Sequence, residues 1–369
     1  MLRVRTLRVQ GSESLIPSRW EHGSEFHWLE FASADESGGA DPWGQAGVFC
    51  ASGRDALRLL VLHGMSQRGW LTLWIPSYMC HTVVRSIAQT GVEMLAYPDD
   101  PRWVSPNLPN MRSRAGDVVL VVNHFGMRTA PSDGYPCDVI EDHTHDPWSD
   151  WACGSEAAYC VASFRKTLPL PDGAVLWSPT GQVLPEEPPC GDDACLSSAL
   201  RLSGALLKRR YLEDGPVKKE SYLRLFKDGE LAVARQAPSG MTPWAREQFA
   251  SLPLGSWRQR RKEGWLELSR LLGEVPGVTI LHPADVIAMV PLGMVMVMRD
   301  GLSRDRMVEH LRRHAVYAAV LWRIERDDAL PGTPDGTVEL SERVLFLHSD
   351  GRYGVADHAR VAAVVADGM

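Results

Sequence analysis

A lysine follows a short apolar segment in the run Ala162-Ser163-Phe164-Arg165-Lys166-Thr167-Leu168-Pro169. Upstream, the apolar pair Val139-Ile140 is closed by Glu141-Asp142, and His145 stands three residues beyond Asp142. A lysine is costly to bury unless it is paired or chemically consumed. Its position beside an apolar segment therefore makes Lys166 the first candidate for a reactive residue.

The bulk composition predicts a soluble globular protein. The chain has 369 residues, 44% hydrophobic and 23% charged, with a formal net charge of -7, so nucleic acid is not an expected partner. No apolar run reaches the length of a membrane span, and the N-terminus lacks the apolar core of a signal peptide. Seven cysteines with no CxxC spacing argue against a disulfide framework or a zinc ribbon, and we expect a cytoplasmic protein.

Short apolar runs recur in the first half of the chain and predict strands. Most are continuous rather than alternating, which is typical of strands covered on both faces. Between them, helices are expected over 54–63, ended by Gly64, and over 81–90, ended by Gly91. This alternation predicts a largely parallel α/β sheet. The expected strands are 71–75, 93–97, 118–122, 139–140, 159–162 and 174–177.

The remainder predicts a loop, a helical region and a smaller α/β lobe. The sequence favours a loop over 178–192 and then helices over 196–212, 220–235 and 255–272. We expect an N-terminal arm (1–45), a large domain (46–250) and a small C-terminal domain (251–369). Within the last, the expected elements are a strand over 289–298, a helix over 304–313, a strand over 317–322 and a closing helix after residue 357.

Pyridoxal phosphate (PLP) chemistry requires the residue types found at two of these strand ends. Lysine forms a Schiff base with the cofactor's aldehyde, and a carboxylate such as Asp142 pairs with the pyridinium nitrogen. His145 would lie near the phenolic oxygen of the ring. The plainer alternatives are a surface lysine and a solvated polar loop. A metal site on the pair His143 and His145 is a further alternative, but no distal ligands have convincing spacing, so no metal is expected.

Two further segments bear on a cofactor site. Ser52-Gly53-Arg54 opens a predicted helix, where free backbone N–H groups and the helix dipole favour a phosphate. The alternative is an ordinary serine N-cap. Tyr78 and Cys80 end a predicted strand, so either could lie against a cofactor ring, or both could be core residues.

The ordered set resembles the DegT–DnrJ–StrS family, the sugar aminotransferase-like branch of fold-type I PLP enzymes. Three segments carry the resemblance: Ser52-Gly53-Arg54-Asp55-Ala56-Leu57, Ile140-Glu141-Asp142 with His145, and Ser163-Phe164 with Lys166. It implies a fold-type I α/β transferase that works as a homodimer. By this resemblance Lys166 is the Schiff-base lysine, Asp142 the pyridinium partner, His145 the contact of the phenolic oxygen and Ser163 a phosphate ligand.

Two positions depart from the family pattern. Arg54 stands where threonine is usual, and its guanidinium adds a charge-assisted phosphate contact. Cys80 falls near the position of the aromatic residue that stacks on the ring, which leaves the stacking residue open.

The resemblance implies a biosynthetic PLP-dependent aminotransferase. Such an enzyme moves an amino group from an amino donor to a small-molecule acceptor, here a keto-sugar or another small ketone. The alternatives are a PLP enzyme of elimination, replacement or decarboxylation, and a binding protein or metal hydrolase built on His143 and His145.

Overall fold

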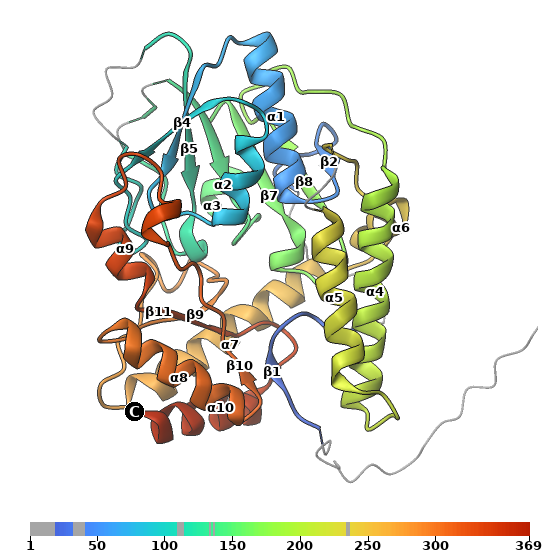
Figure 1. Ribbon diagram of the computed structural model, residues 1–369, viewed down its shortest axis with the longest axis vertical. Coiled ribbons are helices and arrows are strands. Elements are labelled where there is room, and N and C mark those ends of the chain that lie inside the picture. The colour runs from blue at the N-terminus through green and yellow to red at the C-terminus, as the bar shows by residue number, and fades with distance from the viewer. Residues whose placement is uncertain (1–18, 32–40, 109–113, 133, 136, 234–236) are drawn as a thin grey trace, which may run out of the picture.

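The computed structural model describes residues 19–31, 41–108, 114–132, 134–135, 137–233 and 237–369. Its centre is a seven-stranded sheet of order β2-β8-β7-β6-β5-β3-β4 (Figure 1). Strands β3 to β7 are parallel, whereas β8 and β2 are antiparallel to their neighbours, so the expected largely parallel sheet is confirmed. The strands are β2 (Val48–Cys50), β3 (Thr72–Pro76), β4 (Glu93–Tyr97), β5 (Asp117–Val122), β6 (Asp138–Asp142), β7 (Tyr159–Ser163) and β8 (Ala174–Trp177).

Both faces of the sheet are covered, which accounts for its continuous apolar strands. Along β5, Val118 and Leu120 pack in one core with residues of helices α1 (Gly53–Gln67) and α2 (His81–Ala88). Figure 1 shows these two helices beside the sheet. Val119 between them faces a second core, which contains aromatic residues of α6 (Pro243–Ala250) and α7 (Leu254–Gly273). The fold is therefore three-layered at the sheet.

One helix end was predicted wrongly. Gly64 does not end α1, which continues to Gln67. A Cβ at Gly64 would collide with the ring of Trp70, which is buried. The glycine therefore serves close packing between the helix and the chain that enters β3.

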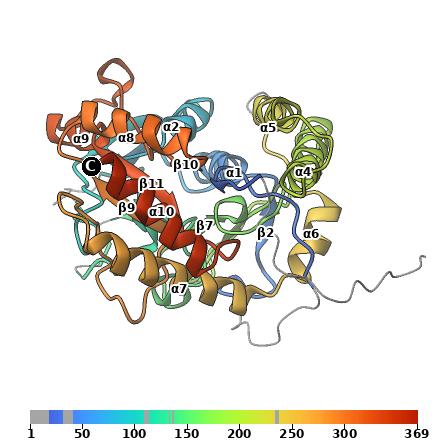
Figure 2. The same cartoon turned by 90° about the horizontal axis from the view of Figure 1, so that it is seen from below.

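A long helical pair follows the loop after β8. Helices α4 (Asp192–Leu212) and α5 (Lys219–Val233) confirm the expected helices of this region, although residues 234–235 lie outside the described residues. The two helices lie side by side (Figures 1 and 2), and Lys219 at the start of α5 donates a hydrogen bond to Tyr317 of the C-terminal part. Short helices complete this half: α3 (Asp150–Cys153), η1 (His124–Gly126) and η2 (Phe164–Lys166).

The C-terminal part has its own core around an antiparallel pair of strands, β9 (Gly293–Val297) and β11 (Val344–His348). The strand expected over 317–322 was wrong beyond Tyr317: β10 is only Val316–Tyr317, paired with β1 (His22–Gly23). Strand β11 was not predicted. The other elements are α8 (Gly301–Arg313), η3 (Arg326–Asp328), α9 (Asp335–Ser341) and α10 (Val355–Gly368).

The division at residues 45 and 250 stays a prediction. Residues 1–18 and 32–40 of the predicted arm lie outside the described residues. The part of the arm at β1 adds a strand to the C-terminal part, which ties the two ends of the chain together. None of the helices described has the length and apolar character needed to cross a bilayer.

Candidate active site

A cavity of about 470 Å³ lies where the carboxyl ends of β6 and β7 meet the start of α1. Ligands of open α/β sheets bind at this edge. All but one of the residues expected at a PLP site line it. They are Ser52, Gly53, Arg54, Cys80, Asp142, His145, Ser163 and Lys166.

The start of α1 faces the end of β7 at close range. Ser52 is the N-cap and accepts a hydrogen bond from the N–H of Asp55 at 3.2 Å, so the N-cap interpretation holds. A Cβ at Gly53 would lie 3.0 Å from the Cβ of Ser163, which leaves room there for little more than glycine. The first N–H groups of a helix have no partner within the helix, and they attract anions. The N-cap and the anion site are thus compatible at this turn.

Asp142 ends β6 as a buried carboxylate beside the cavity. Its Oδ1 accepts the N–H of Thr144 at 2.8 Å. Burial raises the pKa of Asp142 in spite of the hydrogen bonds from Thr144. A cation facing this carboxylate would therefore stabilise its ionised form. A protonated pyridine nitrogen fits that requirement.

His145 is held as a neutral ring with a defined proton. The N–H of Phe125 donates to its Nδ1 at 2.8 Å, so the hydrogen of the neutral ring is on Nε2. Burial, followed by the charges of His124 and Lys166, lowers the pKa of His145 to about 3. His145 therefore stays neutral at ordinary pH and can donate a hydrogen bond through Nε2.

Lys166 lies at the end of η2, three residues beyond the last residue of β7. Its side chain is exposed and lines the cavity. Within the described part of the chain its Nζ has no hydrogen-bond or ion-pair partner, whereas Thr144 ties β6 to β7 by accepting the N–H of Ser163 at 3.0 Å. Within the described residues, Lys166 is thus an exposed amine without a hydrogen-bond or ion-pair partner at the edge of the sheet.

Tyr78 is not among the residues that line the cavity. It is fully buried, its hydroxyl donates to the carbonyl of Leu321, and it accepts the N–H of Trp322 at 3.1 Å. The expected contact with a cofactor ring is therefore not supported, and Tyr78 is a core residue that fastens the segment around Trp322.

Trp322 is an aromatic cavity residue that the sequence analysis missed. Its ring lies at 5.7 Å and 20° from that of His145 and at 6.3 Å and 21° from that of Phe125. Trp322 thus supplies an aromatic ring at the cavity, which Cys80 does not. No local signal identified it, because it reaches the site from the C-terminal part, far from the other motifs.

Four charged residues on four elements line one wall of the cavity or lie just behind it. Glu230 of α5 pairs with Arg54 at 2.7 Å and with Arg165 at 3.4 Å, and Arg201 of α4 donates to the same carboxylate. Three guanidiniums thus converge on one carboxylate. This contact could not be predicted from local sequence patterns, since its members are up to 176 residues apart.

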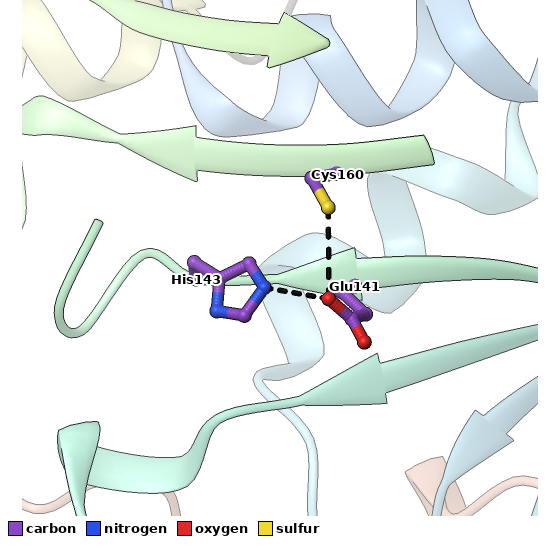
Figure 3. Close-up of side chains that lie close together, drawn as sticks. All are labelled: Glu141, His143 and Cys160. Carbon is purple, nitrogen blue, oxygen red and sulfur yellow. Dashed lines mark hydrogen bonds and ion pairs between the residues drawn. The ribbon is translucent and has the colours of Figure 1, made fainter. Parts of the chain in front are cut away.

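The acidic and histidine side chains of residues 141–145 divide between the two faces of the sheet. Glu141, His143 and Cys160 are fully buried together on the face away from Asp142, with their polar atoms within 4.8 Å of one another (Figure 3). Glu141 accepts hydrogen bonds from His143 at 2.8 Å, Ser155 at 2.6 Å and Trp151 at 2.7 Å, and also from Tyr135. Its oxygens are thus already occupied.

The metal alternative built on His143 and His145 loses its geometric basis. His143 packs edge-on against Trp151, whereas His145 lies near parallel to Phe125. The possible ligand group around Glu141 contains His143 but not His145. A hydrogen-bonded core cluster describes Glu141 and His143 better than a metal site does.

No protein-family model matches this sequence, and no curated protein matches it either. Solved structures do match most of the chain. 3-Amino-5-hydroxybenzoic acid synthase has a TM-score of 0.59 at 19% identity, over 89% of this chain and 88% of its own. A DegT DnrJ EryC1 StrS aminotransferase from Brucella abortus has a TM-score of 0.53 at 15% identity, over 87% and 85%.

A third match is NtdA from Bacillus subtilis, solved with bound cofactor PMP, with a TM-score of 0.55 at 14% identity, over 87% of this chain and 73% of its own. Identities this low establish the fold alone. The expected fold class is confirmed: this chain has the α/β fold of fold-type I PLP enzymes, as found in the DegT, DnrJ, EryC1 and StrS aminotransferases.

Proposed function

We propose that this protein is a PLP-dependent aminotransferase that transfers an amino group from an amino donor to a small ketone or keto-sugar. One observation carries the proposal: Lys166, Asp142 and His145 line a single cavity together with the start of α1. Three separate stretches of sequence meet there, with the residue types that the chemistry of a phosphorylated aldehyde cofactor requires.

The residues present fit that cofactor. The start of α1, with Ser52 and Gly53, and the side chain of Ser163 would hold its phosphate. Asp142, whose pKa is raised by burial, would hold its ring nitrogen in the protonated form. The solved structure of NtdA, which contains PMP, supports a cofactor of this class.

The chain's own side chains would position the reaction and move its proton. When bound, the cofactor supplies an aldehyde that accepts and returns an amino group, and a ring that withdraws electrons. Lys166 would hold the aldehyde covalently through Nζ, and its released amine would act as the base at the substrate's carbon. His145 would donate from Nε2 and fix the orientation of the ring.

Amino transfer is the reaction that we assign within PLP chemistry, because the matching structures include aminotransferases. A homodimer is proposed on the same resemblance. The acceptor is a small ketone of biosynthesis, a class that includes keto-sugars.

A half-reaction tests this function directly. The protein loaded with PLP is mixed with single amino donors, such as glutamate, without any acceptor. We expect one equivalent of the matching keto acid per site and loss of the aldehyde absorbance. Release of ammonia or carbon dioxide in place of the keto acid would show a different PLP reaction.

A further inference from the structure

We propose that Arg54 and Arg165 form an anion site that Glu230 occupies in the ligand-free chain and must yield when a phosphate binds. Glu230 is then an internal competitor from the α4–α5 pair, with no role of its own in the chemistry. The inference rests on the proposed function only in taking the cofactor's phosphate as the natural anion.

The contacts of Glu230 are those of a bound anion. Its Oε1 accepts from Arg54 at 2.7 Å, and its Oε2 accepts from Arg165 at 3.4 Å. Charge-assisted contacts from guanidinium groups are the usual way in which proteins bind phosphate and carboxylate. The two arginines are thus already arranged around an oxyanion, which happens to belong to the protein.

The place of these arginines identifies the anion. Arg54 follows Gly53 in the first turn of α1, and Arg165 stands between Phe164 and Lys166. Gly53 and Ser163, which lie in close contact, are the residues expected to hold the phosphate. Two guanidiniums at this position fit a phosphate dianion better than a singly charged group.

The charge balance leaves room for such a dianion. Arg54, Arg165 and Arg201 meet Glu230 and, at 3.9 Å from Arg201, Glu25. Within the described residues, Nε of Arg201 is buried without a hydrogen-bond partner. Among these five groups, three guanidiniums thus face two carboxylates.

Glu230 is an ionised carboxylate that remains partly open to solvent. Burial opposes its charge, yet the guanidiniums of Arg165, Arg54 and Arg201 outweigh it and lower the pKa of Glu230 to about 2. Its side chain is 45% exposed, so water can solvate the carboxylate when it moves.

Arg201 can keep its ion pair with Glu230 after Glu230 has left Arg54 and Arg165. It is 3% exposed and lies against α5, where a Cβ at Gly229 would meet its Cγ at 2.9 Å. Arg201 therefore stays with α4 and α5. Glu230 can keep this partner while Arg54 and Arg165 turn to the phosphate.

Affinity for inorganic phosphate tests the inference without any cofactor. In Glu230→Gln we expect phosphate to bind about tenfold more tightly than in the wild type. In the wild type, phosphate can bind only the fraction of molecules in which Glu230 has left the arginines, and this lowers the apparent affinity. Isothermal titration calorimetry of the full chain, at fixed ionic strength, gives this number. PLP should gain similarly, whereas pyridoxal, which has no phosphate, should bind unchanged.

Glu213→Gln is the matched control. Glu213 is 44% exposed and pairs with Arg209 at 2.9 Å at the far end of α4, so its loss should leave phosphate affinity unchanged. Glu230→Ala is a second variant, which removes the carboxylate without introducing an amide. It should also bind phosphate more tightly than the wild type.

Weaker or unchanged phosphate binding in both Glu230 variants would overturn the inference, because Glu230 would then be a support that orients the arginines. Tighter phosphate binding without any covalent attachment of PLP would leave the inference standing and defeat the proposed function instead. Equal gains for pyridoxal and PLP would also contradict it, since the phosphate would not be the group that competes.

Discussion

Glu141 and Asp142 are neighbours on one strand, yet they serve two different kinds of site. Glu141 points into the closed side of the sheet, where the donors His143, Ser155, Trp151 and Tyr135 surround it. Asp142 points to the open side, where burial raises its pKa and a cavity begins. A buried polar group whose partners are all internal stabilises the fold, whereas a buried carboxylate with a shifted pKa beside a cavity is a candidate for a functional site.

Removing the open side's nucleophile should have the largest effect. Lys166→Ala is expected to lower amino transfer by roughly a thousandfold or more, because it loses both the covalent anchor and the base. Steady-state rates with one donor and one acceptor measure this. Lys227 lines the same cavity, so Lys227→Ala is the matched control and should keep most of the activity. Equal losses in both variants would contradict the assignment of Lys166.

The two carboxylates should separate activity from stability. Asp142→Asn is expected to reduce the rate by about a hundredfold or more while leaving the fold intact, since it removes one preorganised charge from the reacting centre. Glu141→Gln should instead lower the free energy of unfolding by about 2–4 kcal/mol, because its buried donors lose a charged acceptor.

Urea unfolding and steady-state kinetics on the two variants make this comparison. The reverse outcome, in which Glu141→Gln is stable but inactive, would place the reacting centre on the closed side.

Acid should affect the two carboxylates in opposite directions in the cofactor-free protein. Burial disfavours the charge of Glu141, but hydrogen bonds from His143, Ser155 and Tyr135 outweigh it and lower its pKa. Its stabilisation is present above its ordinary pKa of 4.5 and is lost as the pH falls through the folded value.

The raised pKa of Asp142 has the opposite sign. Its contribution is favourable at low pH and is lost as the pH rises from the ordinary pKa of 3.8 through the folded value. The free energies of unfolding of Glu141→Gln and Asp142→Asn, each relative to the wild type, are measured between about pH 3 and about pH 6. The two differences should change with pH in opposite directions. Parallel curves would show that the two sites do not differ in this way.

A smaller contrast involves one tryptophan on each side. Trp322→Ala should weaken PLP binding by roughly threefold to tenfold, since a stacked aromatic pair contributes about 0.5–1.5 kcal/mol. Trp151→Phe, which removes a hydrogen bond to Glu141, should leave that affinity unchanged and cost about 1 kcal/mol of stability. Fluorescence titration measures the PLP affinity, and thermal unfolding measures the stability. Loss of PLP affinity in Trp151→Phe but not in Trp322→Ala would contradict the assignment of the cofactor site to the open side.

The sheet and the open side could be predicted because their signals are local. Continuous apolar runs mark strands covered on both faces, and residues at the ends of parallel strands meet at one edge. Ser52, Asp142 and Lys166 reach the cavity in this way.

The residues that were missed depend on tertiary contacts between distant segments. Trp322 comes from the C-terminal part and Glu230 from α5, and neither has a local motif. Gly64 was taken for a helix end because the reason for the glycine is not local. The ring of Trp70, which lies beyond the helix, leaves no space for a side chain at this position. Tyr78 stands at a strand end like its neighbours, but its hydroxyl turns to the segment around Trp322.

The most direct test of the account is to find where PLP attaches. The purified protein is incubated with PLP, reduced with borohydride, digested and analysed by mass spectrometry. We predict that the cofactor's mass is added to Lys166 alone, with the absorbance of the loaded protein lost on reduction. No adduct, or an adduct shared equally with Lys227 and other lysines, would contradict the assignment of the open side as a PLP site.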